Sequence, residues 1–356
     1  MLQKYGNIRI FAKMVPLLAL DSFKGCLTAR EAVDAAAAAL AGRDVCLMPL
    51  SDGGEGFADC LADCLGGVFR TVPVHDPLGR PIEASYALLE GGRIAVIETA
   101  VASGLTRLKP EELDPLTASS FGTGELMQDA VQQGVEEIWI GLGGTAVMDC
   151  GAGLLQACSP LPVPVRIHAF YDADVPLSGP AGAPAVFGPQ KGADAQGVAE
   201  LERRFRRQAE TWKAQYGVDA NRLPGAGAAG GIGAALAICL GAEMHAGIEA
   251  VLEAVRFADR VQECGLVITG EGKADRQTLT GKVPFGVLQA TRRHAPGIPV
   301  VLLAGRVEDR DELVAAGFDA VIQVTPEESL KDNYLDKSFA RENIRRAVQD
   351  LVYLRD

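Results

Sequence analysis

The chain has 356 residues, a length that exceeds one ordinary hydrophobic core and predicts two domains. Its formal net charge of -12 argues against a protein that binds nucleic acid or an anionic membrane surface. No apolar stretch of the sequence reaches the roughly 18 residues that a transmembrane helix needs.

The cysteines and the first residues of the chain indicate the cellular compartment in which the protein is expected. The eight cysteines form no CxxC pair, and most lie in apolar or alanine-rich runs, where cysteine behaves as a small hydrophobic residue. This usage favours a reducing compartment over a disulfide framework. Residues 1–15 are too polar for a signal peptide. We therefore expect a cytoplasmic protein, and we leave monomer and homodimer open.

Short apolar runs alternate with alanine-rich helical runs along the chain. The predicted strands are residues 15–20, 45–50, 93–100, 137–142, 266–269, 300–303 and 320–324. The predicted helices are residues 28–40, 54–65 and 152–157, and the first opens with the capping box TARE at 28–31. Strand–loop–helix units in series predict an α/β fold with mostly parallel sheets.

Two consecutive predicted strands end in polar loops, DSFKG at 21–25 and SDGGEG at 51–56. Residues just past the carboxyl ends of parallel strands face one crevice, so we expect five side chains to meet there: Asp21, Ser22, Lys24, Asp52 and Glu55. Bare glycine backbone and carboxylates together suit a phosphate that is carried with Mg²⁺, with Lys24 supplying positive charge. The alternative is that Asp52 and Glu55 only cap the following helix.

A third loop, GLGGTA at 141–146, follows a predicted strand and matches the dinucleotide pattern G-x-G-x-x-A. That fingerprint also needs an acidic residue about 20 positions later, for the ribose. Residues 157–170 contain no acid, so we favour a phosphate-cradling loop. A NAD-dependent oxidoreductase remains the weaker alternative. GAGAAG at 225–230 follows no predicted strand, and we interpret it as a glycine-rich helix entry.

A fourth loop, GEGKAD at 270–275, again places glycine, carboxylate and lysine after a predicted strand. Smaller cues are YDAD at 171–174, GPQKG at 188–192, FGTGE at 121–125 and Glu98-Thr99. This combination suits phosphoryl transfer, in which catalysis is mostly positioning and charge neutralisation. The P-loop and protein-kinase motifs are absent from the sequence, and we interpret the four histidines as structural or exposed.

At these loops the sequence resembles the bacterial type I glycerate kinase family, over residues 21–304. The matching blocks, in family order, are DSFKG at 21–25, LSDGGEG at 50–56, GTGEL at 122–126, GGTA at 143–146 with Asp149, VFGPQKGA at 186–193, and GEG at 270–272 with Asp275, Gln277-Thr278 and Gly281-Lys282. The resemblance implies phosphorylation of a glycerate hydroxyl with ATP and Mg²⁺. The family product is 2-phosphoglycerate or 3-phosphoglycerate, depending on the member, and type I resembles the members that give 2-phosphoglycerate.

The resemblance also implies a fold. One flavodoxin-like (Rossmann-like) α/β domain with a mostly parallel sheet is expected from residues 1–105 and 290–356. A second α/β domain, residues 106–289, is expected to be inserted into it, with the active site in the cleft between the two.

The expected site residues follow from the same matching blocks. The expected catalytic residues are Asp52, Lys24, Asp275, Asp149 and Lys282. The expected substrate- and phosphate-binding residues are Asp21, Ser22, Gly53, Gly54, Glu55, Thr123, Gly143, Gly144, Thr145, Glu271, Gln277 and Thr278. Asp174 is the expected metal ligand. Which acid is the base and which binds the metal stays open.

The sequence departs from the family pattern at two amide positions. Met148 stands where the family motif GGSATNDGG has asparagine, and Val175 stands where the motif DVDNP has asparagine. Amides of this kind select hydroxyl and carboxylate groups of a substrate. Three alternatives therefore remain for the acceptor half: glycerate, another small hydroxy acid, or a catalytically weak sensor.

Overall fold

The computed structural model describes residues 15–161, 164–329 and 335–353. It divides into a terminal unit, Met1–Asp52 with Ile248–Asp356, and an inserted unit, Gly53–Gly247. One α/β unit is thus inserted into another, as predicted. Residues 1–14, which form nearly all of the segment judged too polar for a signal peptide, lie outside the described residues.

The boundaries between the units differ from the expected ones. The chain passes between units at Asp52/Gly53 and at Gly247/Ile248, whereas the sequence analysis places the boundaries at 105/106 and 289/290. The pairing of the strands explains why the boundaries differ. Residues 94–98 pair with 137–141 inside the inserted unit, and residues 266–270 pair with 16–20 inside the terminal unit. The chain therefore leaves the terminal unit within the SDGGEG loop, one predicted strand earlier than expected.

The terminal unit contains a five-stranded parallel sheet. Its strands are β1 (Pro16–Leu20), β2 (Cys46–Leu47), β9 (Leu266–Ala274), β10 (Val300–Val307) and β11 (Ala320–Gln323), in the spatial order β11-β10-β9-β1-β2. Numbered along the described chain, this order is 2-1-3-4-5, which is the flavodoxin-like order. The predicted fold of this unit is confirmed.

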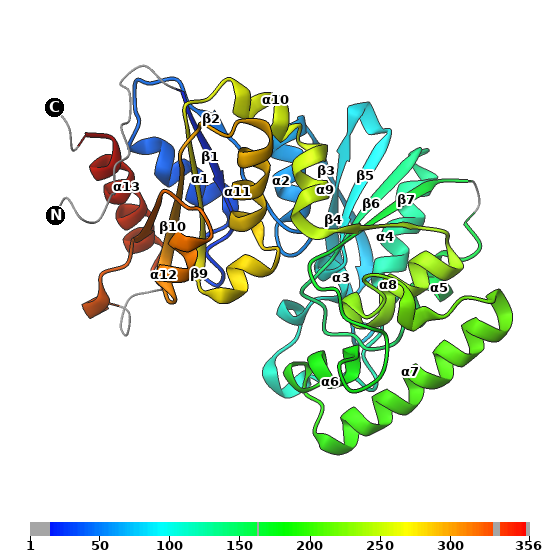
Figure 1. The fold of residues 1–356 in the computed structure, drawn as a ribbon. Coiled ribbons are helices and arrows are strands. Elements are labelled where there is room, and N and C mark those ends of the chain that lie inside the picture. Colours follow the sequence, from blue (N-terminus) through cyan, green and yellow to red (C-terminus); the bar gives the residue numbers. More distant parts are fainter. Residues whose placement is uncertain (1–14, 162–163, 330–334, 354–356) are drawn as a thin grey trace. The chain divides into compact units, whose positions relative to one another are not determined.

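Helices cover both faces of that sheet (Figure 1). α1 (Ala29–Ala38) and α13 (Lys337–Tyr353) share one apolar core with the sheet, and α11 (Val283–His294) packs against β9 on the opposite side. The remaining described helices are α9 (Gly247–Ala254), α10 (Phe257–Gln262) and α12 (Arg310–Ala315). The capping box of α1 is confirmed, because Thr28 Oγ1 accepts from Glu31 N at 3.1 Å while the Glu31 carboxylate accepts from Thr28 N at 2.9 Å.

The inserted unit contains a six-stranded mixed sheet in the order β3-β4-β5-β6-β7-β8. Its strands are β3 (Val68–His75), β4 (Pro81–Leu89), β5 (Ile94–Glu98), β6 (Glu137–Leu142), β7 (Arg166–Tyr171) and β8 (Glu243–Ala246). The first three strands pair antiparallel, and the strands from β5 to β8 pair parallel. The sequence analysis does not predict β3, β4, β7 or β8.

Two helical layers flank this sheet. α4 (Phe121–Gln132), α5 (Ala152–Cys158) and α8 (Ala228–Cys239) share the core of one face, and α2 (Phe57–Leu65) packs on the other, with the Phe57 ring 4.9 Å from the Phe170 ring. α3 (Ala100–Ser103), α6 (Ala183–Phe187) and α7 (Ala195–Tyr216) complete the unit's described helices. Across the described residues, no helix combines the length and apolar character needed to cross a bilayer.

Candidate active site

The order of the terminal sheet reverses between β1 and β9, and such a switch point is where open α/β sheets bind ligands. A cavity of about 470 Å³ lies there, at the carboxyl ends of the strands. Six of the predicted site residues line it: Asp21, Ser22, Lys24, Asp52, Glu271 and Lys282. The sequence analysis thus identified a set of residues that the fold brings together. Glu55, predicted for the same cluster, is exposed and does not line this cavity.

Buried carboxyl groups dominate the floor of the cavity. Asp21 is 7% exposed, and its Oδ1 accepts a hydrogen bond from Ser22 N at 2.6 Å. Burial and the neighbouring Asp52 carboxylate raise the pKa of Asp21 to about 8. Burial also raises the pKa of Glu271, although Thr278 Oγ1 donates to its Oε1 at 2.6 Å and Lys282 Nζ lies 3.6 Å from its Oε2.

The cavity has a mixed-charge wall with an unused hydroxyl group. Three acidic and four basic side chains line it, the basic ones being Lys24, Lys273, Lys282 and Arg306. Ser22 Oγ is buried and has no hydrogen-bond partner among the residues that the structure describes. An orphaned buried hydroxyl is costly unless a ligand uses it. Carboxylate and hydroxyl oxygens are also the donors that Mg²⁺ prefers, so the residues present fit a phosphate group that is carried with this cation.

Asp275 and its neighbours support the site from outside the cavity wall. The Asp275 carboxylate accepts from Gln277 N at 2.8 Å and pairs with Lys273 Nζ at 3.0 Å. Burial works to raise the pKa of Asp275, but these partners hold the pKa below its usual value. Asp275 and Gln277 do not line the cavity, and Thr278 reaches it only through Glu271. The structure therefore gives Asp275 a capping role in this loop.

In the inserted unit, two glycine-rich loops approach each other at backbone distance. A Cβ atom on Gly143 would lie 2.6 Å from Gly54 Cα, and one on Gly53 would lie 2.9 Å from the carbonyl oxygen of Phe170. Gly53 and Gly144 also have φ values of +96° and +66°, in the left-handed region that favours glycine. The glycines of both predicted loops are thus required by close packing and by backbone conformation.

The helix after the GLGGTA loop begins late. α5 begins at Ala152, well beyond Gly143 and Gly144, whereas a dinucleotide fingerprint opens directly into its helix. This geometry, together with the missing acidic residue, argues against the nicotinamide alternative.

Glu98 anchors the SDGGEG loop, although the sequence analysis noted it only as a strand end. Its carboxylate accepts from Ala58 N at 2.8 Å and from Gly56 N at 3.3 Å, at the start of α2. Burial raises the pKa of Glu98 to about 7 in spite of these donors. Sequence reasoning had one usable indication, namely an acidic residue at the end of an otherwise apolar strand.

A second polar cluster surrounds Lys191. Its Nζ donates to Thr145 Oγ1 at 3.1 Å and to Val147 O at 2.9 Å. Burial lowers the pKa of this amine to about 7, although Asp149 and Asp172 act in the opposite direction. Lys191 is absent from the predicted site residues, yet it lies in the GPQKG block that carries the family resemblance.

The other predicted residues of this unit make structural contacts. Asp149 accepts from Ser120 N and Oγ at 2.9 and 2.8 Å and from backbone N–H groups at the start of α5. Thr123 is fully buried and bonds Ser103 at 2.7 Å. Asp174 is exposed, and its Oδ1 accepts from Gly225 N at 2.9 Å. Met148 packs within an apolar core, so its thioether replaces the family amide in a buried position.

Comparison with known proteins shows extensive similarity. A model of the glycerate kinase family matches residues 16–163 and 158–355. The glycerate kinase of Halalkalibacterium halodurans is 37% identical, covering 87% of this chain and 90% of that protein. The glycerate 2-kinase of Escherichia coli is 36% identical over 94% and 96%. A crystal structure of a putative glycerate kinase 2 from Salmonella typhimurium superposes with a TM-score of 0.81 at 35% identity, covering 96% and 98%.

Proposed function

This chain belongs to the glycerate kinase family, and from that premise we propose that it transfers the terminal phosphoryl group of Mg-ATP to a hydroxyl group of glycerate. The observation that carries the proposal is the cavity at the β1/β9 switch point, where buried carboxyl groups, lysines and an unpartnered serine hydroxyl converge. By analogy with the E. coli relative, the proposed product is 2-phosphoglycerate.

Each group in the cavity has a role that its chemistry supports. Lys24 and Lys282 attract the phosphate oxygens or the acceptor carboxylate and offset the overall negative charge of the protein. Ser22 Oγ donates to a phosphate oxygen or ligates the cation. The Asp21 and Asp52 pair would hold the cation, and one carboxylate of the pair would take the proton of the acceptor hydroxyl. When bound, Mg²⁺ neutralises charge on the transferring phosphoryl group.

The glycine loops of the inserted unit are a separate set of candidate phosphate contacts in this proposal. The N–H groups of Gly54, Gly143 and Gly144 can contact phosphate because their positions carry no side chain. Lys191 orders the following segment through Thr145 and Val147. Asp174 remains a predicted metal ligand.

The test is steady-state ADP release with Mg-ATP, with and without D-glycerate. We expect turnover that depends on glycerate, and we expect Asp21→Asn and Asp52→Asn each to lower kcat by about 100-fold or more. Lys282→Met should also reduce turnover, whereas Lys213→Met, on an exposed part of α7, serves as the matched lysine control. Full turnover in both aspartate variants would refute the assigned site. ADP release with another hydroxy acid but not with glycerate would show that the acceptor is that other acid.

A further inference from the structure

Two histidines and a glutamate come together on the sheet of the inserted unit, on the face that α2 covers. His168 Nδ1 lies 3.0 Å from His245 Nε2 and 3.5 Å from Glu243 Oε2, and His245 Nε2 lies 3.9 Å from the same carboxylate oxygen. The ligand atoms of all three residues lie within 4.8 Å of one another. Neither the proposed phosphoryl transfer nor the sequence analysis gives these residues a task.

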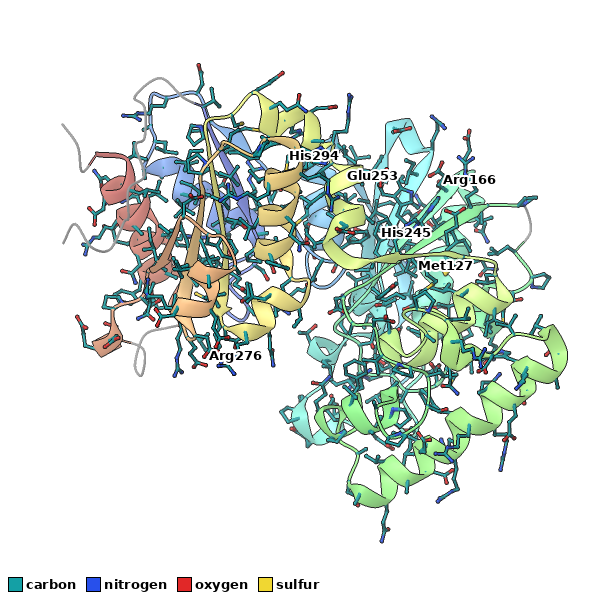
Figure 2. All side chains as sticks on the ribbon, in the orientation of Figure 1. Met127, Arg166, His245, Glu253, Arg276 and His294 are labelled. Atoms are coloured by element: carbon teal, nitrogen blue, oxygen red, sulfur yellow. The ribbon has the colours of Figure 1, made fainter. Side chains whose placement is uncertain are left out.

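The register of the parallel strands creates this cluster. His168 on β7 pairs directly with Glu243 on β8, and Phe170 pairs with His245 two residues along. Side chains two residues apart on a strand share one face, so all four project from the same side of the sheet. Figure 2 labels His245 on β8, and Arg166 at the start of the neighbouring strand.

Aromatic rings hold the imidazoles in place. The His245 ring stacks on Phe170 with centroids 5.2 Å apart, and the His168 ring meets Trp139 edge-on at 6.4 Å. The two histidine side chains are 19% and 31% exposed, so they are partly desolvated and still reachable by a small ion.

We propose that His168, His245 and Glu243 form a binding site for a divalent transition-metal cation of the Zn²⁺ class. Two imidazole nitrogens and one carboxylate oxygen are the donor set of three-ligand zinc sites, which keep a fourth position for water or a ligand. Bonds of about 2.1 Å in a tetrahedron place ligand atoms roughly 3.4 Å apart. The observed separations of 3.0, 3.5 and 3.9 Å bracket that value. Mg²⁺ prefers oxygen ligands and does not suit this set.

An outer carboxylate completes the arrangement. Glu137 Oε2 lies 3.7 Å from His168 Nε2, the ring nitrogen that points away from the cluster, and it accepts a hydrogen bond from Trp139 Nε1 at 3.1 Å. A metal-bound histidine commonly directs its second nitrogen at such a carboxylate, which fixes the ring orientation and raises its basicity. Glu137 is therefore a positioning residue for His168.

The test is calorimetric titration of Zn²⁺ into the full chain, prepared without a histidine tag and stripped with chelator. We expect one site that the variants His168→Gln and His245→Gln each weaken by at least about 100-fold, and that Glu137→Gln weakens by about tenfold. His294→Gln, an exposed histidine on α11, is the matched control and should leave the affinity unchanged. Because eight cysteines also offer zinc ligands, Co²⁺ absorption provides a second measurement.

Tetrahedral Co²⁺ bands without a thiolate charge-transfer band would support the site, as would their loss in His245→Gln. Zinc affinity that is equal in the wild type and in His168→Gln would overturn it. In that case the cluster is a hydrogen-bonded histidine pair beside a surface glutamate. Activity with Mg-ATP is not the readout, so failure of this proposal leaves the proposed function intact.

Discussion

Replacing Lys191 by methionine removes a charge that the inserted unit keeps almost entirely from water. The side chain is 3% exposed and donates to Thr145 Oγ1 and Val147 O. Burial lowers its pKa from an ordinary 10.5 to about 7. The methionine side chain has a similar length and carries no titratable group, so comparison with this variant isolates the titration of the Lys191 amine.

The sign and size of the effect follow from the two pKa values. Between about pH 7 and 10.5 the unfolded chain holds a proton on this lysine that the folded protein has lost, so the free energy of unfolding rises with pH. The cost of burying the charge is fully present below pH 7 and is gone above pH 10.5. Integrating the difference in bound protons from pH 7 to 8.5 shows that the free energy of unfolding of the wild type rises by about 1.6 kcal/mol relative to that of Lys191→Met.

Urea denaturation followed by tryptophan fluorescence reports the free energy of unfolding of the inserted unit, which contains Lys191. Both tryptophans of the chain, Trp139 and Trp212, lie in the inserted unit. The stability difference between wild type and Lys191→Met should change by about 1.6 kcal/mol between pH 7 and 8.5, and Lys213→Met should show no such change. A difference that stays constant within about 0.5 kcal/mol would refute the view that Lys191 is buried as a perturbed amine.

Two further predictions concern the glycine loops. Because Glu98 holds a proton up to about pH 7 when folded but only up to about 4.5 when unfolded, wild-type stability falls as pH rises. The free energy of unfolding of Glu98→Gln, relative to that of the wild type, should therefore rise by about 2.5 kcal/mol between pH 5 and 8, measured by the same urea titrations. Gly143→Ala places a methyl group 2.6 Å from Gly54 Cα and should cost about 1–3 kcal/mol and most of the turnover, whereas Gly297→Ala, in open space, should cost neither. An unchanged melting temperature in Gly143→Ala would argue against the backbone contact.

The terminal unit was largely predictable because its longer strands begin with short apolar runs that polar residues follow. β1 and β9 are neighbours inside the sheet, and their apolar runs are buried. Asp21 directly follows β1, whereas Glu271 lies inside β9, three residues past its apolar run Leu266–Ile268. The rule that such ends share one crevice then places Asp21, Asp52 and Glu271 around one cavity. The strands of a parallel sheet all end at the same edge, so the shared position of these loops can be predicted without knowing any side-chain contact.

The inserted unit was harder to predict because its strands are partly exposed. β3 alternates between exposed and buried residues and carries arginine and threonine, and β8 has only four residues. The division between units also escaped prediction. A strand, loop and helix in sequence normally pack on one sheet, but here β2 joins one sheet and α2 packs against the other.

Roles within the site depend on contacts that spacing does not reveal. Asp275 and Asp149 read as free catalytic acids in the sequence, yet each is occupied by backbone N–H donors. Lys191 lies in the GPQKG cue, which the sequence analysis noted without assigning this lysine a role, and the fold buries it against Thr145. Only the folded chain distinguishes a capping carboxylate from one that faces a cavity.

The most direct test of the central claim is phosphorus NMR of a reaction that contains this protein, Mg-ATP and D-glycerate. The account predicts a new phosphomonoester resonance of 2-phosphoglycerate that grows in step with ADP, and its loss in Asp52→Asn. ADP with free phosphate as the only other product, or no ADP at all, would contradict the assignment of a glycerate-phosphorylating site.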